Sequence, residues 1–420
     1  MRSSVSIDQL KVGVYIHLDM GWMDHPFSFS SFKIKSQEQI DTLRRMGLTA
    51  VRFDPSRSDA EPAPAAPAPG PAPVPMPDAA EDPQLAKKRE RQERLKKQRE
   101  TLARVERQYN KTAAAVRNLQ NGLAANPARS LGETAALVQR LTTEFFAQPE
   151  ITIHAVLGQP GAAESSVHLL NTVLLGLLVA RELGLAAEEA CLLGQGALYH
   201  DIGLQEVPSR ILRKTDPLTA AERAARELHC EAGVRLGRAM ALPEAVLAII
   251  GQHHELADGS GYPHKLKGEA ITLPARIVAL VNQFDNLCNP VSAARALTPH
   301  EALSHLFSHQ RPKYDARAMQ AFIRCLGVYP PGTLVQLSNE ALCLVSCVNT
   351  ARPLKPTVVV FDPKTPRDTP ILLDLAEEPE LNISRALKPA QVAAPVQEYL
   401  SGRGRVAYFF ESAAEPQAQS

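Results

Sequence analysis

The chain has 420 residues, of which 45% are hydrophobic, 22% charged and 5% aromatic, a composition typical of globular proteins with more than one domain. Lysine and arginine together number 46 and aspartate and glutamate 45, so the overall charge gives no reason to expect binding to nucleic acid or to a membrane surface. The N-terminus lacks the pattern of a signal peptide, and the apolar run at residues 173–180 is too short to span a bilayer. We therefore expect a soluble protein.

Six cysteines are present, and no two of them form a Cys-x-x-Cys pair. Most lie in apolar segments, where unpaired cysteine behaves as a small hydrophobic residue. Without an export signal, reduced thiols are expected rather than a disulfide framework. The cysteines therefore favour a cytoplasmic location.

The first 55 residues predict a small α+β module. Its expected elements are strands at residues 12–18, 27–34 and 50–53 and a helix at residues 37–46. Ser36 and Gln39 have the spacing of a capping box, which predicts where the helix begins. Trp22, the only tryptophan of the chain, is expected in the core of this module.

Residues 56–84 predict an extended linker, because proline and alanine dominate this stretch. Residues 85–130 predict a long charged helix. Along it, apolar side chains recur every seven residues, at Leu95, Leu102, Tyr109, Val116 and Leu123. Two interpretations are open: a coiled coil that forms a homodimer through residues 95–123, or a single helix that packs on the next domain. Basic residues near its start alternate with glutamates, which indicates a solvated helix face.

Residues 131–328 predict successive helices, so the expected fold class is mainly α. A second capping box, Thr219 with Glu222, predicts a helix that runs through His229 toward residue 236. The C-terminal extension, residues 329–420, is expected to contain strands. They are predicted at residues 342–348, 357–361 and 405–410.

Several of the twelve histidines have a distinctive placement. Two groups follow the ends of apolar helices, and one more pair lies four residues apart on one helix face. These groups are His200 with Asp201, His253 with His254 and Glu255, and Glu164 with His168. Imidazole and carboxylate form the ligand set of Zn, Fe, Mn and Ni. The pattern therefore indicates a metal centre.

An adjacent histidine and aspartate, such as His200 and Asp201, can serve two metals at once, because the carboxylate bridges them. Cations bridged in this way polarise a phosphate and lower the pKa of a bound water. Five other histidines lack such placement and are interpreted as ordinary core or surface residues. They are His154, His264, His300, His305 and His309.

Residues 258–263 form a short loop with two glycines and a proline, directly after the second histidine group. Together with His200-Asp201-Ile202-Gly203 and His229, this loop resembles the HD-GYP family over roughly residues 164–327. Residues 7–54 resemble the small module of unknown function that often precedes such domains. The resemblance implies a helical metal-dependent phosphohydrolase fold. It also implies hydrolysis of the bacterial messenger cyclic di-GMP to pGpG or on to GMP.

The resemblance also implies roles for individual residues. His200 and Asp201 are expected at the catalytic centre, and Gly261, Tyr262 and Pro263 at the substrate. The expected cofactors are two or three divalent ions of Fe, Mn, Ni or Zn. Their implied ligand positions are Glu164, His168, His200, Asp201, His229, His253, His254 and Asn282.

Two positions depart from the family pattern. Leu204 stands where the family has a lysine near the scissile phosphate, and Arg210 or Lys214 are candidates to replace that cation. Asn282 stands where the family has a metal-binding aspartate, which predicts weaker binding of at least one metal.

Three interpretations of the function are open, and Leu204 and Asn282 motivate the second. The first is an active cyclic di-GMP phosphodiesterase. The second is a degenerate member that binds cyclic di-GMP, or a partner such as a diguanylate cyclase domain, without turnover. The third is a helical protein whose histidines carry no metal.

Overall fold

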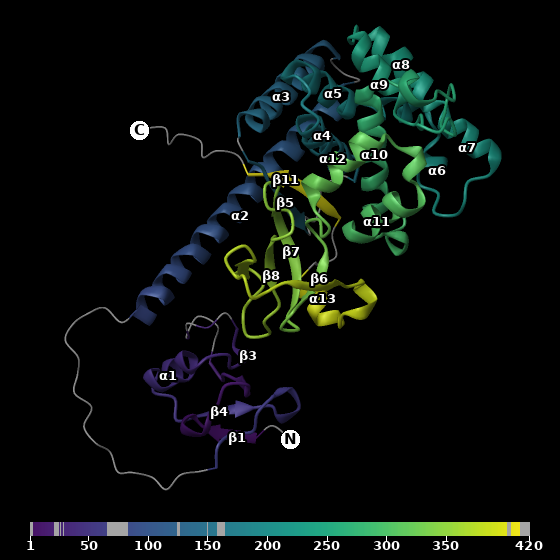
Figure 1. Cartoon of the computed structure of the whole chain (residues 1–420). Coiled ribbons are helices and arrows are strands. Elements are labelled where there is room, and N and C mark those ends of the chain that lie inside the picture. Colours follow the sequence, from purple (N-terminus) through teal and green to yellow (C-terminus); the bar gives the residue numbers. More distant parts are fainter. Residues whose placement is uncertain are drawn as a thin grey trace, which may run out of the picture. The chain divides into compact units, whose positions relative to one another are not determined.

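The computed structural model describes residues 3–20, 25, 27, 29–64, 83–123, 127–148, 150–157, 164–400 and 405–411. The chain divides into two compact units, one of residues 1–100 with 362–371 and one of residues 101–361 with 372–420 (Figure 1). Trp22 and most of the expected linker, residues 65–82, lie outside the described residues.

The N-terminal unit contains a small antiparallel sheet and one longer helix. The strand order is β1 (Ser3–Ser6), β4 (Ala50–Phe53), β2 (Tyr15–His17) and β3 (Ser31–Lys33), and the helix is α1 (Gln37–Arg45). Ile40 and Leu43 of α1 share a core with Val14 and Ile16 of the sheet. The α+β prediction is confirmed, although β1 was not expected and the strands at 12–18 and 27–34 are shorter than predicted.

The capping box predicted for α1 is wrong in detail. Ser36 occupies the N-cap position, but its side chain makes no capping hydrogen bond. Instead, the Gln39 side-chain oxygen accepts a hydrogen bond from the backbone N–H of Lys35 at 2.7 Å. In a capping box, Gln39 would accept from the backbone N–H of Ser36, but here it accepts from the residue before. Ser36 therefore takes no part in a side-chain capping bond.

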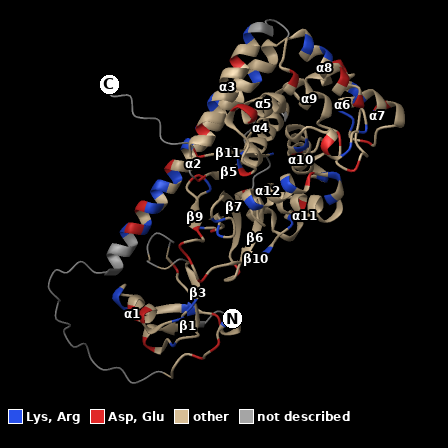
Figure 2. Ribbon diagram, turned by 45° about the horizontal axis from the view of Figure 1, so that its top comes forward, with Lys and Arg blue, Asp and Glu red and all other residues tan. Residues whose placement is uncertain are grey.

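The long charged helix is α2 (Pro83–Gly122). Figure 2 shows basic and acidic residues mixed along its described part, as expected for a solvated face. The opposite seam is buried in the chain's own core, with Val105, Tyr109, Val116 and Leu119 at most 7% exposed. Because the same chain covers this seam, the structure favours a single packed helix over a coiled-coil homodimer.

The second unit is mainly helical, as predicted. Its longer helices are α3 (Pro127–Ala147), α4 (Glu164–Glu182), α5 (Ala187–Tyr199), α7 (Ala220–Glu227), α8 (His229–Ala239), α9 (Glu244–Gln252), α10 (Leu273–Cys288), α11 (Pro299–His309) and α12 (Ala316–Leu326). The Thr219–Glu222 capping box is confirmed. None of the helices that the structure describes combines the length and apolar character needed to cross a lipid bilayer.

The helix predicted to run through His229 is in fact two helices. α7 ends at Glu227, and His229 is the first residue of α8 after a break at Leu228. The capping box marks the start of α7 but carries no information about its end. Because of this break, His229 is the first residue of a helix and not an interior one. It therefore lies at a helix terminus, as do His200 and His253.

A seven-stranded sheet joins the helical region to the C-terminal residues. The main path runs β10 (Ile383–Ala386), β6 (Leu334–Leu337), β7 (Leu342–Asn349), β5 (Thr152–Leu157) and β11 (Val406–Phe410), and β8 (Thr357–Val360) and β9 (Ile371–Asp374) continue from β7. The expectation of uninterrupted helices over 131–328 is wrong at β5. Its partners β7 and β11 are distant in sequence, so no local hairpin signal marks it.

Strand β11 is the least local element of this sheet. It pairs antiparallel with β5 and packs against α4. Its aromatic residues enter the helical core, where Phe410 meets Phe145 edge to face and Phe409 meets Tyr109. The end of the chain's described part therefore lies inside the core of the helical unit.

We predict that Tyr109→Ala lowers the free energy of unfolding of the second unit by about 3–5 kcal/mol, the usual cost of removing a buried aromatic ring. Tyr109 is 1% exposed and contacts Phe409. Chemical denaturation followed by circular dichroism measures the change. Asn110→Ala, at the exposed neighbouring position, is the control. Equal stability of the two variants would contradict the packing of α2 described above.

Candidate metal centre

Four histidine side chains converge from four helices of the second unit. His168 lies in the second turn of α4, His200 follows α5, His229 begins α8, and His253 follows α9. All are buried or nearly so, with His200, His229 and His253 at most 1% exposed. Separate helix termini therefore bring to one point side chains that are far apart in sequence.

Three of these imidazoles are oriented by carbonyl groups of the preceding turn. His200 Nδ1 lies 2.7 Å from the oxygen of Ala197, and His253 Nδ1 lies 2.8 Å from that of Ile250. His229 Nδ1 lies 2.6 Å from the carbonyl oxygen of Arg226. A carbonyl oxygen only accepts hydrogen bonds, so each Nδ1 carries the proton. Each Nε2 therefore presents a lone pair to the centre.

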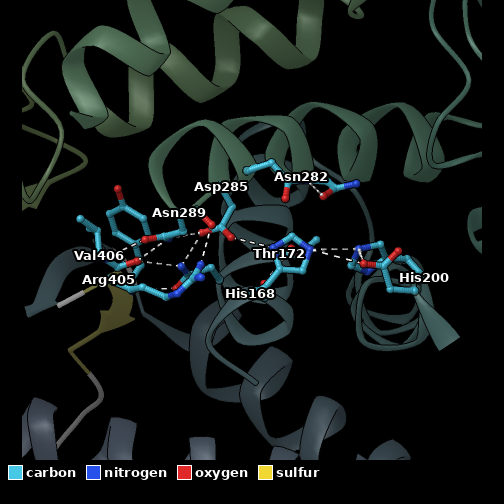
Figure 3. Close-up of polar contacts among 12 residues, drawn as sticks. His168, Thr172, His200, Asn282, Asp285, Asn289, Arg405 and Val406 are labelled. Carbon is cyan, nitrogen blue, oxygen red and sulfur yellow. Dashed lines mark hydrogen bonds and ion pairs between the residues drawn. The ribbon is translucent and has the colours of Figure 1, made fainter. Parts of the chain in front are cut away.

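The fourth imidazole is oriented by a carboxylate. His168 Nδ1 lies 2.6 Å from Oδ2 of Asp285, and it donates its proton there as the other three rings donate to carbonyls. Burial alone would lower the pKa of His168, but the hydrogen bond to Asp285 raises it above the usual value. His168 Nε2 is thereby directed at His200 Nε2, 3.3 Å away (Figure 3).

The carboxylate of Asp201 lies between the two pairs of imidazoles. Its Oδ2 is 3.4 Å from His200 Nε2 and 3.8 Å from His168 Nε2. Its Oδ1 is 3.4 Å from His229 Nε2 and 3.7 Å from His253 Nε2. Each carboxylate oxygen thus faces one imidazole pair, the arrangement that a carboxylate bridging two cations requires.

The donor set fits divalent cations. In each pair, two Nε2 atoms with lone pairs face one another, at 3.3 Å for His168 and His200 and 3.2 Å for His229 and His253. Two lone pairs repel at this distance unless a positive charge lies between them. Two groups of ligand atoms gather here, one of His168, His200 and Asp201 and one of Asp201, His229, His253 and His254.

The ionisation states of Asp201, His253 and His254 suit metal binding. Burial lowers the pKa of His253 to about 4 and holds that of His254 well below its usual value. Burial alone would raise the pKa of Asp201, but the neighbouring His200 and His253 hold it well below its usual range. Neutral imidazoles and an ionised carboxylate are the forms that coordinate cations.

A glycine of the His-Asp-Ile-Gly stretch makes this geometry possible. A Cβ at Gly203 would lie 2.0 Å from the carbonyl oxygen of His229 and 2.6 Å from the nitrogen of Gly233. Only a residue without a side chain permits the turn after Asp201 to approach α8 this closely. This contact sets the position of Asp201 relative to His229.

Asp285 is a positioning residue of the centre. Its Oδ2 holds His168, and its Oδ1 accepts hydrogen bonds from the side chains of Asn171 at 2.6 Å and Asn289 at 2.8 Å. Both asparagines also donate to the carbonyl oxygen of Val406 in β11. Sequence reasoning missed Asn171 and Asn289, although a buried asparagine one turn after His168 in an apolar helix was a usable signal.

Two of the expected ligand positions are less closely defined. Asn282 is 3% exposed and lies on α10, one turn before Asp285 (Figure 3). Its side-chain oxygen accepts a hydrogen bond from Asn286 at 2.6 Å. Glu164 begins α4, but its side chain lies outside the described residues. Both remain predicted ligands.

The loop at residues 258–263 covers the His254 side of the centre. The Tyr262 ring stacks on His254 with ring centroids 4.6 Å apart, and the Tyr262 N–H donates to the His254 carbonyl at 3.1 Å. A Cβ at Gly261 would lie 2.5 Å from that carbonyl oxygen, so glycine is required there. The Tyr262–Pro263 peptide bond is cis.

Glu255 fixes the other end of this loop. It is 1% exposed, and its two carboxylate oxygens accept hydrogen bonds from the backbone N–H groups of His264 at 2.7 Å and Leu266 at 2.9 Å. The sequence pattern places Glu255 in a group with His253 and His254 without giving it a role of its own. The structure gives it one, because it closes the loop that carries Tyr262 and does not join the cluster of ligand atoms.

A cavity of about 450 Å³ opens beside His168 and Asp201. Asp201, with a quarter of its side chain exposed, faces it. The lining residues come from α2, α3, α4, α5, α10 and the segments around them. They include Leu119, Leu123, Leu169, Tyr199, Leu204, Gln205, Asn286, Asn289 and Arg405. The metal centre therefore adjoins a space of the size that small-molecule ligands occupy.

Comparison with known proteins is consistent with this geometry. Residues 164–318 match the family described as "HD domain", and residues 3–134 match the one described as "Domain of unknown function (DUF3391)". Residues 164–318 belong to the HD domain family. The resemblances inferred from the histidine groups and from the N-terminal module are confirmed.

Three known proteins are similar in sequence to this HD domain protein. A Pseudomonas aeruginosa protein named cyclic di-GMP phosphodiesterase is 27% identical over 364 residues, 86% of this chain and 85% of the relative. The cyclic di-GMP phosphodiesterase response regulator RpfG of Xanthomonas campestris pv. campestris is 37% identical over 149 residues, 35% of this chain and 39% of the relative. The 3'3'-cGAMP-specific phosphodiesterase 2 of Vibrio cholerae is 36% identical over 162 residues, 38% of this chain and 31% of the relative.

We predict that Asp201→Asn lowers the bound metal from about two ions per chain, one for each group of ligand atoms, to fewer than one. The substitution removes the negative charge that both imidazole pairs share. Elemental analysis of protein purified with Mn or Fe available measures the content. Asp216→Asn, at an exposed position, should retain full occupancy; a fully loaded Asp201→Asn variant would contradict the bridging role.

Proposed function

We propose that this chain is a metal-dependent phosphodiesterase that hydrolyses cyclic di-GMP to pGpG, to GMP or to both. The observation that carries the proposal is the pair of facing imidazole pairs around Asp201, beside a cavity of about 450 Å³. Two of the relatives above are named as phosphodiesterases of cyclic di-GMP, and their names suggest this substrate. Divalent cations of Fe, Mn, Ni or Zn would polarise the phosphate and lower the pKa of an attacking water.

Each group of residues has a distinct task in this proposal. His168, His200, His229, His253 and Asp201 hold the cations. Asp285 keeps His168 in the tautomer whose Nε2 faces the centre. Tyr262 borders the site on the His254 side, where the resemblance expects substrate contact. The apolar cavity wall excludes water from the nucleotide. Hydrolysis then adds water across one P–O bond, and no protein nucleophile is needed.

A second candidate function is binding without turnover. Leu204 lines the cavity without a charge, and Asn282 offers an amide where the family has a carboxylate. Both features would weaken catalysis more than binding. The proposed contact with diguanylate cyclase domains stays a prediction, since it concerns a surface rather than this centre.

The direct test combines turnover and binding on one preparation. Purified protein loaded with Mn or Fe should convert cyclic di-GMP to linear products, measured by chromatography. Chelation should abolish turnover and re-addition of metal should restore it, because the cations polarise the phosphate. Tight binding without product would favour the second function, and product from 3'3'-cGAMP but not cyclic di-GMP would reassign the substrate. If the protein neither binds nor hydrolyses either dinucleotide, both functions are contradicted.

The contribution of Asn282 can be measured separately. We expect Asn282→Asp to raise both metal content and turnover, because it restores a negative charge one helical turn from Asp285. Gln283→Glu adds the same charge on a neighbouring face of α10 and should change neither. If Asn282→Asp leaves metal content and turnover at the level of the natural chain, the amide is not what limits the centre.

A further inference from the structure

The cavity beside the metal centre has one arginine and no lysine among the described residues that line it. The arginine is Arg405, and Leu204 lines the same space. Cyclic dinucleotides carry negatively charged phosphodiesters, and a cavity that binds them gains from a fixed cation. The absence of a lysine at position 204 thus raises the question of which residue supplies the positive charge.

The two candidates expected from the sequence do not answer it. Lys214 forms an ion pair with Glu222 at 2.6 Å, within the segment that contains α6 (Ser209–Leu212) and α7. Neither Lys214 nor Arg210 is among the residues that line the cavity. The lysine that the family places after His-Asp-Ile-Gly is therefore not replaced from the neighbouring segment.

Arg405 is held in place at the start of β11. Its Nη1 donates to the carbonyl oxygen of Asn289 at 2.5 Å. The following residue, Val406, exchanges backbone hydrogen bonds with the Asn289 side chain, which accepts at 3.0 Å and donates at 2.9 Å. Asn171 also donates to Val406, and its oxygen accepts from the N–H of Tyr408. Figure 3 shows Arg405 and Val406 beside Asn289, at the end of the network away from His200.

Arg405 lines the same cavity as Asp201, the carboxylate that belongs to both groups of ligand atoms. A guanidinium group carries five N–H donors in a planar fork that matches phosphate oxygens.

We propose that Arg405 binds the phosphate of the substrate and supplies, from the C-terminal strand, the cation that the family carries at the position of Leu204. The inference rests on the proposed function. It assigns to a residue outside the HD domain match, residues 164–318, a direct part in substrate binding. The substrate-binding site would thus be completed by the last described strand.

The test uses the full chain and compares substitutions of Arg405 and Leu204. We expect Arg405→Ala to lower kcat/KM for cyclic di-GMP roughly 100-fold, the usual effect of removing a donor to developing charge, with metal content unchanged. Arg405→Lys should lose less. Leu204→Lys combined with Arg405→Ala should recover part of the loss, because residue 204 lines the same cavity. Arg385→Ala, at an exposed position in β10, is the control.

Rescue by Leu204→Lys separates phosphate binding from a structural role, since a lysine there cannot repair the backbone of β11. Unchanged kinetics in Arg405→Ala, or a loss explained by lost metal and not recovered by Leu204→Lys, would overturn the proposal.

Bis(4-nitrophenyl) phosphate, a simple phosphodiester, is assayed in parallel. If it is cleaved while cyclic di-GMP is not, the substrate of the proposed function fails, but Arg405 is still tested on the simple diester. If the natural chain binds cyclic di-GMP without turnover, the dissociation constants of the same variants decide. If neither compound binds, both proposals fail.

Discussion

The sharing of one carboxylate between two pairs of imidazoles is the interaction on which the centre depends. Asp201 can serve both pairs only because each ring is held in the tautomer that turns a lone pair toward it. Three rings are held by carbonyl oxygens of the preceding turn and the fourth by Asp285. Helix termini are well suited to this task, because their last carbonyl groups have no partner within the helix.

The supports of the centre extend well beyond the helices that carry its ligands. Asp285 is fixed by Asn171 and Asn289, and these two side chains also hold the backbone of β11. The hydrogen bonds form a continuous network from the seven-stranded sheet to the ring of His168 (Figure 3). The orientation of His168, one of the predicted metal ligands, is thus linked to the packing of a strand outside the HD domain match.

The sequence allowed the chemistry of the centre to be predicted because its signals are local. His200 and Asp201 are adjacent, as are His253 and His254, and each pair follows an apolar helix that periodicity makes visible. The loop that carries Tyr262 comes directly after the second pair. The mainly helical fold and the N-terminal α+β module were predicted from the same kind of local pattern.

What could not be predicted depends on contacts between distant residues. Local patterns place β5 in a helical stretch, because its partners β7 and β11 are far away in the sequence. The break before His229 lies where the start of α8 packs closely against Gly203, a contact that no capping signal reports. Asn289 and Arg405 come together only because β11 lies beside α10. Their spacing in the sequence therefore does not predict this contact.

The position of β11 bears on how the protein is made. Its aromatic residues fill the core between α2, α3 and α10, and its backbone completes the support of His168. During synthesis this strand emerges from the ribosome after every helix that supplies a metal ligand. The hydrogen-bond network that holds His168 is therefore incomplete until β11 has been synthesised, and a cation bound at this centre would meet the full set of oriented side chains only then.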